Sequence, residues 1–365
     1  MALRLTILET AARARAELRI GAAVVLMRGE SGALVGAAET LTADRLAALR
    51  AAGPADLTVT GRRAETLKAR AYDGDVARIE LEADFGAERI RAAADPAQDL
   101  ATPMKGPFRT RRGGDAGLHR AAVRLAKQAH LLPAALLAAL PSRAAAEALA
   151  AREGLTALDA DAWLAAEAEA VEMRPVSAAR VPIRAAATTR VHVFRPGDGT
   201  EEHYAVEIGS PDRSTPVLAR LHSACFTGDV LGSLKCDCGP QLGGALAAMG
   251  AAGAGVLLYL NQEGRGIGLA NKMRAYSLQD QGFDTVEANH RLGFEDDERD
   301  FRIGATILGR LGFTSVRLLT NNPRKVGMMA NSGVSVAERV PLVVGETPEN
   351  ARYLATKAAK SGHLL

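Results

Sequence analysis

The uneven distribution of cysteine and histidine along this chain constrains its fold most, because it divides the sequence near residue 175. All three cysteines and five of the seven histidines follow that point, whereas the part before it is rich in alanine. A chain of 365 residues is long for one hydrophobic core, so we expect two domains. We place them at residues 1–172 and 183–365. The expected linker, 173–182, contains two prolines and has no strong periodicity.

The apolar pattern predicts different elements in the two parts. In the first part, alanine-dominated helical patterns cover residues 118–139 and 142–172. In the second, strand-like runs alternate with helix-like runs, which predicts an α/β fold with mixed sheets. Ligands of such folds bind in the loops that follow the strands. The expected strands of the second part are 217–221, 255–260 and 316–319, and its expected helices are 240–249, 269–281, 302–311 and 323–331.

Charge and hydropathy narrow the class of partner. The formal net charge of +3 is small for this length and gives no electrostatic support for coating a nucleic acid. The N-terminus has charges throughout and lacks the apolar core of a leader, and no later stretch is long and apolar enough to span a membrane. We therefore expect a cytoplasmic protein that acts on a small molecule, with no nucleic-acid or membrane partner.

The cysteines lie in the segment CFTGDVLGSLKCDC, at positions 225, 236 and 238. Thiolates are strong zinc ligands, and three protein ligands leave a tetrahedral ion one open position for water, which is typical of a catalytic site. Two other interpretations remain open on the spacing alone. A fourth residue such as His222 would close a structural site, or the cysteines are merely buried.

Four segments around and beyond the cysteines resemble GTP cyclohydrolase II: RLHSACFTGDVLGSLKCDCGPQL, NQEGRGIGLANKMRAYSLQDQGFDTVEANHRLGF, DDERDFRIGATIL and LLTNNPRKV. The resemblance runs in order from about Pro182 to Leu365 and ends on the tail YLATKAAKSGHLL. It implies a zinc-dependent homodimer that hydrolyses GTP to formate, pyrophosphate and 2,5-diamino-6-(5-phospho-D-ribosylamino)pyrimidin-4(3H)-one, the first step of riboflavin biosynthesis.

The resemblance also implies roles for individual residues. Cys225, Cys236 and Cys238 match the ligands of one zinc ion per chain. Tyr276 matches an active-site tyrosine, Asp297 a proton acceptor and Arg299 a nucleophile. The expected substrate contacts are Arg220, Leu221, His222, Ser223, Ala224, Gln241, Glu263, Gly264, Arg265, Thr285, Thr320 and Lys325.

Some of these positions have an ordinary structural interpretation as well. Tyr276 fits a core aromatic on an amphipathic helix. The acidic run 295–300 fits the start of a helix, where negative charge is stabilising. Because an arginine is almost never deprotonated, stabilising the charge of released pyrophosphate is an easier task for Arg299 than nucleophilic attack.

The phosphate end of the substrate has its own sequence features. Thr320 ends an expected strand, and the following Asn-Asn-Pro turn opens a helix whose free amides, with Lys325, suit an anion. The resemblance implies Mg²⁺ on the GTP phosphates, although no acidic pair names its ligands. Ala224 departs from the glutamate that many relatives have beside the first cysteine, which puts only that side-chain contact in doubt.

The first part, from about Ala12 to Ala168, resembles 3,4-dihydroxy-2-butanone 4-phosphate synthase, an enzyme often fused ahead of the cyclohydrolase. Its acidic metal loop is replaced by VVLMRGESGALVGAAE, with Gly29, Ser31 and Ala33 at the acidic positions. The Gly-His-Thr-Glu motif is GLHR, with Leu118 at the metal histidine and Arg120 at the catalytic glutamate. A one-residue slip would offer His119 instead, but we find no carboxylate to accompany it.

A magnesium site needs several oxygen ligands, which these residues do not supply. We therefore expect residues 1–172 to be a catalytically inactive remnant, a pseudoenzyme domain. Two alternatives stand beside this interpretation. One is a bifunctional enzyme that also makes 3,4-dihydroxy-2-butanone 4-phosphate from ribulose 5-phosphate, and the other is a non-catalytic GTP-sensing zinc protein.

Overall fold

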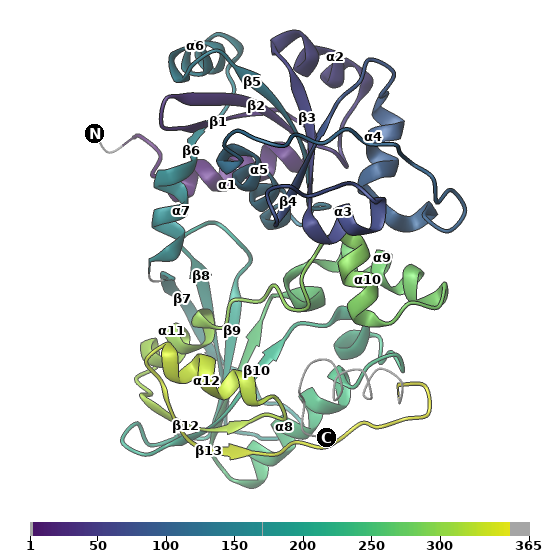
Figure 1. The fold of residues 1–365 in the computed structure, drawn as a ribbon. Helices are drawn as coiled ribbons and strands as arrows, with labels where there is room; N and C mark the ends of the chain where they lie inside the picture. The colour runs from purple at the N-terminus through teal and green to yellow at the C-terminus, as the bar shows by residue number, and fades with distance from the viewer. Residues whose placement is uncertain (1–2, 170, 351–365) are drawn as a thin grey trace. The chain divides into compact units, whose positions relative to one another are not determined.

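The computed structural model describes residues 3–169 and 171–350, so the resemblance of the tail 353–365 lies outside the described residues. The chain forms two compact units. Unit 1 comprises Met1–Ala170 and Ala270–Asp297, and unit 2 comprises Val171–Leu269 and Glu298–Leu365. Each unit contains its own mixed sheet, as expected for this class (Figure 1). Among the described residues, no helix has both the length and the apolar character that crossing a bilayer requires.

Unit 1 is built on a six-stranded sheet in the order β4-β3-β5-β2-β1-β6. Only β1 and β6 pair in parallel. The strands are β1 (Val24–Arg28), β2 (Ser31–Ala37), β3 (Ala55–Thr60), β4 (Val76–Glu80), β5 (Ala134–Leu140) and β6 (Ala157–Asp159). The helices are α1 (Ile7–Arg19), α2 (Ala43–Ala52), α3 (Gly61–Leu67), α4 (Ala87–Ala94), α5 (Gly117–Gln128), α6 (Arg143–Glu153), α7 (Ala160–Ala168), α9 (Leu269–Asp280) and α10 (Thr285–Leu292), with a 3-10 turn at Pro96–Gln98.

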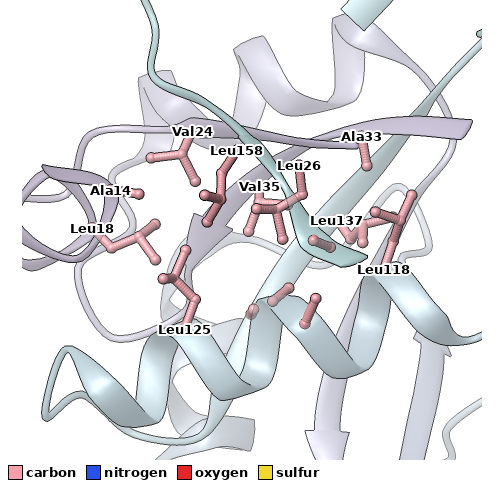
Figure 2. Packing of buried hydrophobic residues seen from close by; sticks show 14 of the residues in the cluster. Ala14, Leu18, Val24, Leu26, Ala33, Val35, Leu118, Leu125, Leu137 and Leu158 are labelled. Carbon is pink, nitrogen blue, oxygen red and sulfur yellow. The ribbon is translucent and has the colours of Figure 1, made fainter. Parts of the chain in front are cut away.

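The core of unit 1 fills the space between the sheet and helices α1 and α5. Figure 2 shows Leu18 of α1, Leu26 of β1 and Leu125 of α5 meeting there, and all three are fully buried. Leu118 and Ala33 belong to the same apolar cluster. Positions that would hold metal ligands in a synthase therefore contribute to hydrophobic packing in this chain.

The helix expected at residues 118–139 is wrong in its second half. Helix α5 ends at Gln128, and residues 134–140 form β5, which lies between β3 and β2. A strand buried on both faces needs apolar residues at every position, so a run of alanine and leucine fits it as well as a buried helix. The pattern 142–172 is likewise divided, because β6 separates α6 from α7.

Unit 2 is built on a seven-stranded sheet in the order β13-β12-β10-β11-β9-β8-β7. Strands β13, β12, β10 and β11 are parallel, and the remaining pairs are antiparallel. The strands are β7 (Met173–Arg180), β8 (Thr189–Pro196), β9 (His203–Ile208), β10 (Val217–Ser223), β11 (Gly255–Leu260), β12 (Ser315–Leu319) and β13 (Ser335–Val340). The helices are α8 (Cys238–Ala251), α11 (Arg302–Arg310) and α12 (Pro323–Asn331), with short turns at Phe226–Val230 and Glu263–Gly266.

The linker expected at residues 173–182 is wrong, because most of it forms the edge strand β7 paired with β8. Proline is tolerated at a sheet edge, and the pairing shifts register just after Pro175. The other elements expected in the second part are present. Residues 255–260 and 323–331 coincide with β11 and α12.

Alternation along the strands of unit 2 assigns side chains to two faces. Ala219 and Leu221 of β10 join the cluster that includes Ile307 and Leu308 of α11. Leu257 of β11 joins the cluster formed with α8. Successive strand residues point to opposite faces, so Arg220 and His222 lie on the α8 side. Because β10, β11 and β12 are parallel, their carboxyl ends meet at one edge of the sheet.

Candidate metal centre and active site

The three cysteines converge at that carboxyl edge. Cys225 follows β10, Cys236 lies in the next loop, and Cys238 is the first residue of α8. Their sulfur atoms all lie within 4.8 Å of one another, and Cys225 Sγ is 3.7 Å from Cys236 Sγ. Within residues 3–169 and 171–350, this is the single cluster of three or more candidate metal ligands. It does not include His222, so the structure gives no support to a fourth ligand from that residue.

The backbone at Gly228 closes one side of this thiol cluster. A Cβ atom at residue 228 would lie 2.8 Å from Cys236 Sγ and 3.1 Å from Cys225 Sγ, which only glycine avoids. Cys225 and Cys236 are each 5% exposed. Three soft sulfur ligands in a small, closely lined space fit a zinc ion.

The electrostatics of the cluster favour a cation. The hydrogen bond with Cys225, together with burial, raises the pKa of the Cys236 thiol. Hydrogen bonds with Cys225 and Cys236, together with burial, raise the pKa of Cys238 well above its ordinary value. Adjacent buried thiols resist ionising together, and a divalent metal removes that cost because it binds the thiolates.

Asp229 supports the cluster and was missed by the sequence analysis. Its carboxylate accepts hydrogen bonds from Cys225 N at 3.0 Å and from Tyr259 Oη at 3.0 Å. His222 Nε2 lies 3.0 Å from the same oxygen. The side chains of Asp229 and His222 are each 3% exposed, and the His222 ring stacks on Tyr259. The Thr-Gly-Asp turn between the first two cysteines was the available signal.

Arg220 and Lys325 are buried beside the ends of β10 and β12. Arg220 donates to Leu319 O at 2.9 Å and to Gln241 Oε1 at 2.5 Å. Burial lowers the pKa of Arg220 to about 10, so it remains a cation at neutral pH. Lys325 Nζ donates to Leu221 O at 3.1 Å. Both cations are thus held by neutral acceptors at the edge that carries the thiol cluster.

Arg299 adds a third cation to this edge. Its Nη1 donates to Ser223 Oγ at 3.1 Å, two residues before the first cysteine. The Arg299 guanidinium and Lys325 Nζ lie 4.9 Å and 5.1 Å from the centre of the Phe301 ring. Three neighbouring cations create a positive potential that suits a polyphosphate.

The loop after β11 has an unusual backbone. Gly264, Arg265 and Gly266 have φ angles of 64°, 63° and 92°, in the left-handed region. The carboxylate of Glu263 accepts from Phe226 N at 2.6 Å and from Gly264 N at 2.9 Å, which ties this loop to the cysteine loop. A Cβ atom at residue 266 would lie 2.9 Å from the backbone of Glu298, so the glycine permits a close approach of the two segments.

The remaining expected contacts of unit 2 also lie at the carboxyl edge. Ala224 N donates to Leu260 O at 2.8 Å, and Thr320 Oγ1 accepts from Asn322 N at 3.1 Å. The Leu221 side chain is 1% exposed within the core, so only its backbone is available to a ligand. The structure gathers these residues in unit 2: Arg220, Leu221, His222, Ser223, Ala224, Cys225, Cys236, Cys238, Gln241, Glu263, Gly264, Arg265, Arg299, Thr320 and Lys325.

Three expected site residues belong to unit 1. Tyr276 is half-buried on α9, with Lys272 Nζ 5.7 Å from its ring centre. Thr285 is the first residue of α10, and Asp297 is exposed. The helix start considered for residues 295–300 is wrong, because residues 297–300 are irregular and α11 begins at Arg302.

The altered synthase positions of unit 1 have structural partners. Arg120 pairs with Asp75 at 2.8 Å. His119 Nε2 lies 3.3 Å from Asp56 Oδ2, so the expectation that no carboxylate accompanies His119 is wrong. Arg111 Nε also donates to that oxygen, at 2.6 Å. This group is an ion pair of a histidine and an arginine with one carboxylate, and it lacks the several oxygens of a magnesium site.

Comparison with known proteins gives one family match and close relatives. The model of the family described as GTP cyclohydrolase II matches residues 174–341. A protein named GTP cyclohydrolase-2 from Azospirillum brasilense is 45% identical over 361 residues, which are 97% of this chain and 93% of that protein. A GTP cyclohydrolase-2 from Azotobacter vinelandii is 56% identical over 190 residues, 52% of this chain and 91% of the relative.

Among solved structures, a two-domain 3,4-dihydroxy-2-butanone 4-phosphate synthase from A. baumannii aligns with 90% of this chain and 99% of its own. The identity is 18% and the TM-score 0.34. A likeness of that size carries no argument about the fold or the activity of unit 1. The relative from Azospirillum brasilense does, however, extend along nearly the whole of this chain.

Proposed function

Because this chain belongs to the GTP cyclohydrolase II family, we propose that its three thiolates hold the zinc ion with which the enzyme opens the guanine ring of GTP. The products are formate, pyrophosphate and 2,5-diamino-6-(5-phospho-D-ribosylamino)pyrimidin-4(3H)-one, at the first step of riboflavin biosynthesis. The observation that carries the zinc assignment is the cluster of Cys225, Cys236 and Cys238 beneath the backbone of Gly228. Family membership makes the alternative of a non-catalytic GTP sensor wrong.

The chemistry that zinc supplies when bound is Lewis-acid activation of the attacking water. Asp229 orients the first ligand, because it fixes the backbone amide of Cys225 and the side chain of His222 through one buried carboxylate. Burial and Asp229 raise the pKa of Tyr259, so its hydroxyl keeps its proton and remains a donor to that carboxylate. These bonds hold the thiolate arrangement rigid while the substrate binds.

The cations Arg220, Arg299 and Lys325 bind the triphosphate in this proposal. Arg299 serves as a fixed positive charge for the departing pyrophosphate, which a protonated guanidinium performs without an unusual environment. Asp297 accepts a proton during ring opening, and its exposed carboxylate lies in irregular backbone. Tyr276 contacts the substrate. The further substrate contacts are Leu221, His222, Ser223, Ala224, Gln241, Glu263, Gly264, Arg265, Thr285 and Thr320.

The wider assignments follow the same family pattern. One zinc ion binds per chain, Mg²⁺ accompanies the GTP phosphates, and the enzyme is a cytoplasmic homodimer without nucleic-acid or membrane partners. The domain corresponding to residues 1–172 has no synthase activity. Leu118 lies in the apolar core, and Arg120 is paired with Asp75, so neither side chain offers a metal ligand or a proton acceptor.

Zinc content and formate release of Cys236→Ser test the proposal. The variant loses one of three ligands, so both zinc and formate release fall to background. Leu234→Ala is the matched control, since it removes a 56% exposed side chain from the same loop and leaves both quantities unchanged. Full zinc content with normal formate release in Cys236→Ser would remove the thiolate site from the account.

A further inference from the structure

The segment of unit 1 that lies far away in the sequence carries an unexpected set of contacts. The chain leaves unit 2 after Leu269 and returns to it at Glu298, and the residues between them, 270–297, are part of unit 1. We call these residues the inserted segment. In Figure 1 its helices α9 and α10 lie beside α3. The segment contains Tyr276, Thr285 and Asp297.

The first end of the inserted segment is held by buried polar bonds. Asn271 is fully buried and donates to His130 O at 3.0 Å. His130 has a φ angle of 56°, a conformation that a residue with a side chain adopts only when its surroundings fix it. Arg274 donates to Glu39 at 2.9 Å and 3.3 Å, and Glu39 also accepts from Leu132 N at 2.8 Å.

The second end is held in the same way. Thr60 Oγ1 donates to Gly293 O at 2.8 Å, and a Cβ atom at residue 293 would lie 2.8 Å from that hydroxyl. Arg63 is 1% exposed and donates to Arg291 O at 3.3 Å. Arg62 forms an exposed ion pair with Glu295 at 3.0 Å. Contacts from the first 170 residues therefore fix both ends of the segment.

The inserted segment depends on this support for its own structure. Helix α9 has 12 residues and α10 has 8, and isolated helices shorter than about 12–15 residues are marginal in water. Leu278, Leu292 and Phe294 are each 1% exposed or less, so packing within unit 1 supplies the stability.

We infer that the first 170 residues act as a positioning frame for the inserted segment, and that Glu39, Thr60 and Arg63 are positioning residues for the cyclohydrolase reaction. This inference rests on the proposed roles of Tyr276 and Asp297. A domain without residues for chemistry of its own thereby contributes to the reaction of the family, because it sets where two reacting side chains are held. Loss of a contact loosens the segment without removing any group that touches the substrate.

The test uses the full-length chain with Glu39→Ala, which removes the acceptor of Arg274 and of Leu132 N. Hydrogen exchange of peptides from residues 270–297 accelerates about tenfold, as local opening becomes easier. The kcat for formate release falls about tenfold, while KM for GTP and the zinc content change little. Glu39→Gln keeps an oxygen acceptor and recovers most of the kcat. Glu147→Ala, on α6 at the opposite end of unit 1, is the matched control and changes neither quantity (Figure 1).

Arg62→Ala is a second, milder variant, because its pair with Glu295 is exposed and its loss leaves the fold intact. It accelerates exchange in the segment about twofold, with a matching decrease of kcat. Unchanged exchange at 270–297 in both variants overturns the inference, and so does faster exchange with an unchanged kcat. A wild-type protein that releases no formate would instead contradict the proposed activity, and exchange would still decide whether the frame exists.

Discussion

The two units differ in what their charged side chains meet where chemistry is expected. In unit 1, Arg28 pairs with Asp115 and Asp161, each at 2.8 Å, and Arg120 pairs with Asp75. In unit 2, neutral oxygens of Leu319, Leu221 and Ser223 hold the three cations of the site. An ion pair within the protein cancels the charge that a phosphorylated ligand would use, whereas a neutral acceptor leaves it in place. Similar residue types thus produce a structural unit and a reactive one.

The metal positions show the same difference. Leu118 and Ala33 of unit 1 pack into the apolar core around α5 (Figure 2). In unit 2 the backbone of Gly228 makes room for three sulfur atoms. A site is lost once its ligand positions join the hydrophobic core, because restoring a polar ligand there opposes the packing of its neighbours.

The largest effect on the reactive side of this comparison is expected at Asp297 and Arg299. Asp297→Asn removes the proton acceptor and Arg299→Ala removes a charge that stabilises the departing group. Each lowers kcat about 10²–10⁴-fold, the usual range for general acid–base catalysis, with zinc content unchanged. Steady-state formate release with zinc analysis measures both. Near-normal turnover in either variant would return that residue to an ordinary loop position.

On the structural side, Leu118→His tests whether a synthase ligand can return. The imidazole replaces a leucine that is 8% exposed in the core, so the free energy of unfolding falls by about 2–4 kcal/mol and no metal site appears. Urea unfolding followed by fluorescence measures this, since Trp163 is the single tryptophan of the chain and is buried in the same cluster. A variant of unchanged stability that binds Mg²⁺ would contradict the loss of the site.

A smaller effect on the reactive side is expected from Asp229→Asn. The amide cannot accept from all three donors, so zinc affinity falls about 10–100-fold, as is usual for residues that orient a ligand. Competition with a chromophoric chelator measures the affinity. Asp212→Asn, in an exposed turn of unit 2, is the matched control. Equal affinities of the two variants would show that Asp229 does not support the metal site.

Acidification should separate the two units by the smallest effect. Burial lowers the pKa of His203 to about 4, and His203 Nδ1 accepts from Asn261 N at 3.0 Å. Its neutral form is therefore favoured on folding, so stability present above pH about 6.5 is lost as pH falls toward 4. Unit 2 loses about 2 kcal/mol between pH 7.5 and 5.

Unit 1 resists the same change in pH. Hydrogen bonds from Arg120 lower the pKa of Asp75, so the stability from this pair is present above its ordinary pKa and is lost only as pH falls below about 4. Hydrogen exchange of β9 peptides at pH 5, beside Trp163 fluorescence, distinguishes the units. His203→Asn keeps an acceptor without titrating and removes the effect. A simultaneous loss of both units at pH 5 would contradict the difference.

The sequence predicted the elements around the reactive site well. Strand β11 and helix α12 have distinct apolar runs bounded by glycine or by an Asn-Pro start, and both were placed at their observed bounds. Residues 134–140 were assigned to a helix, since alanine and leucine suit a buried strand and a buried helix alike. The strand at Met173–Arg180 was missed because its two-residue alternation is weak and proline suggested a linker.

Long-range contacts were beyond sequence reasoning in both units. No local pattern indicates that residues 270–297 belong to unit 1, since Asn271 meets His130 across 141 positions. The burial of Arg220 and Lys325 was also unexpected, because a cation near a strand end is usually solvated. Asp229 was visible only as one polar residue among others until its three donors were brought together.

One measurement tests the contrast between a reactive and a structural unit most directly: product analysis after one sample of purified chain is given GTP, ribulose 5-phosphate, zinc and magnesium. The account predicts stoichiometric formate and pyrophosphate from GTP and no four-carbon phosphate from the sugar, because the three thiolates and three cations of unit 2 are assembled whereas Leu118 and Arg120 of unit 1 are committed to packing and to an ion pair. Formation of 3,4-dihydroxy-2-butanone 4-phosphate above background would contradict it and make the chain bifunctional.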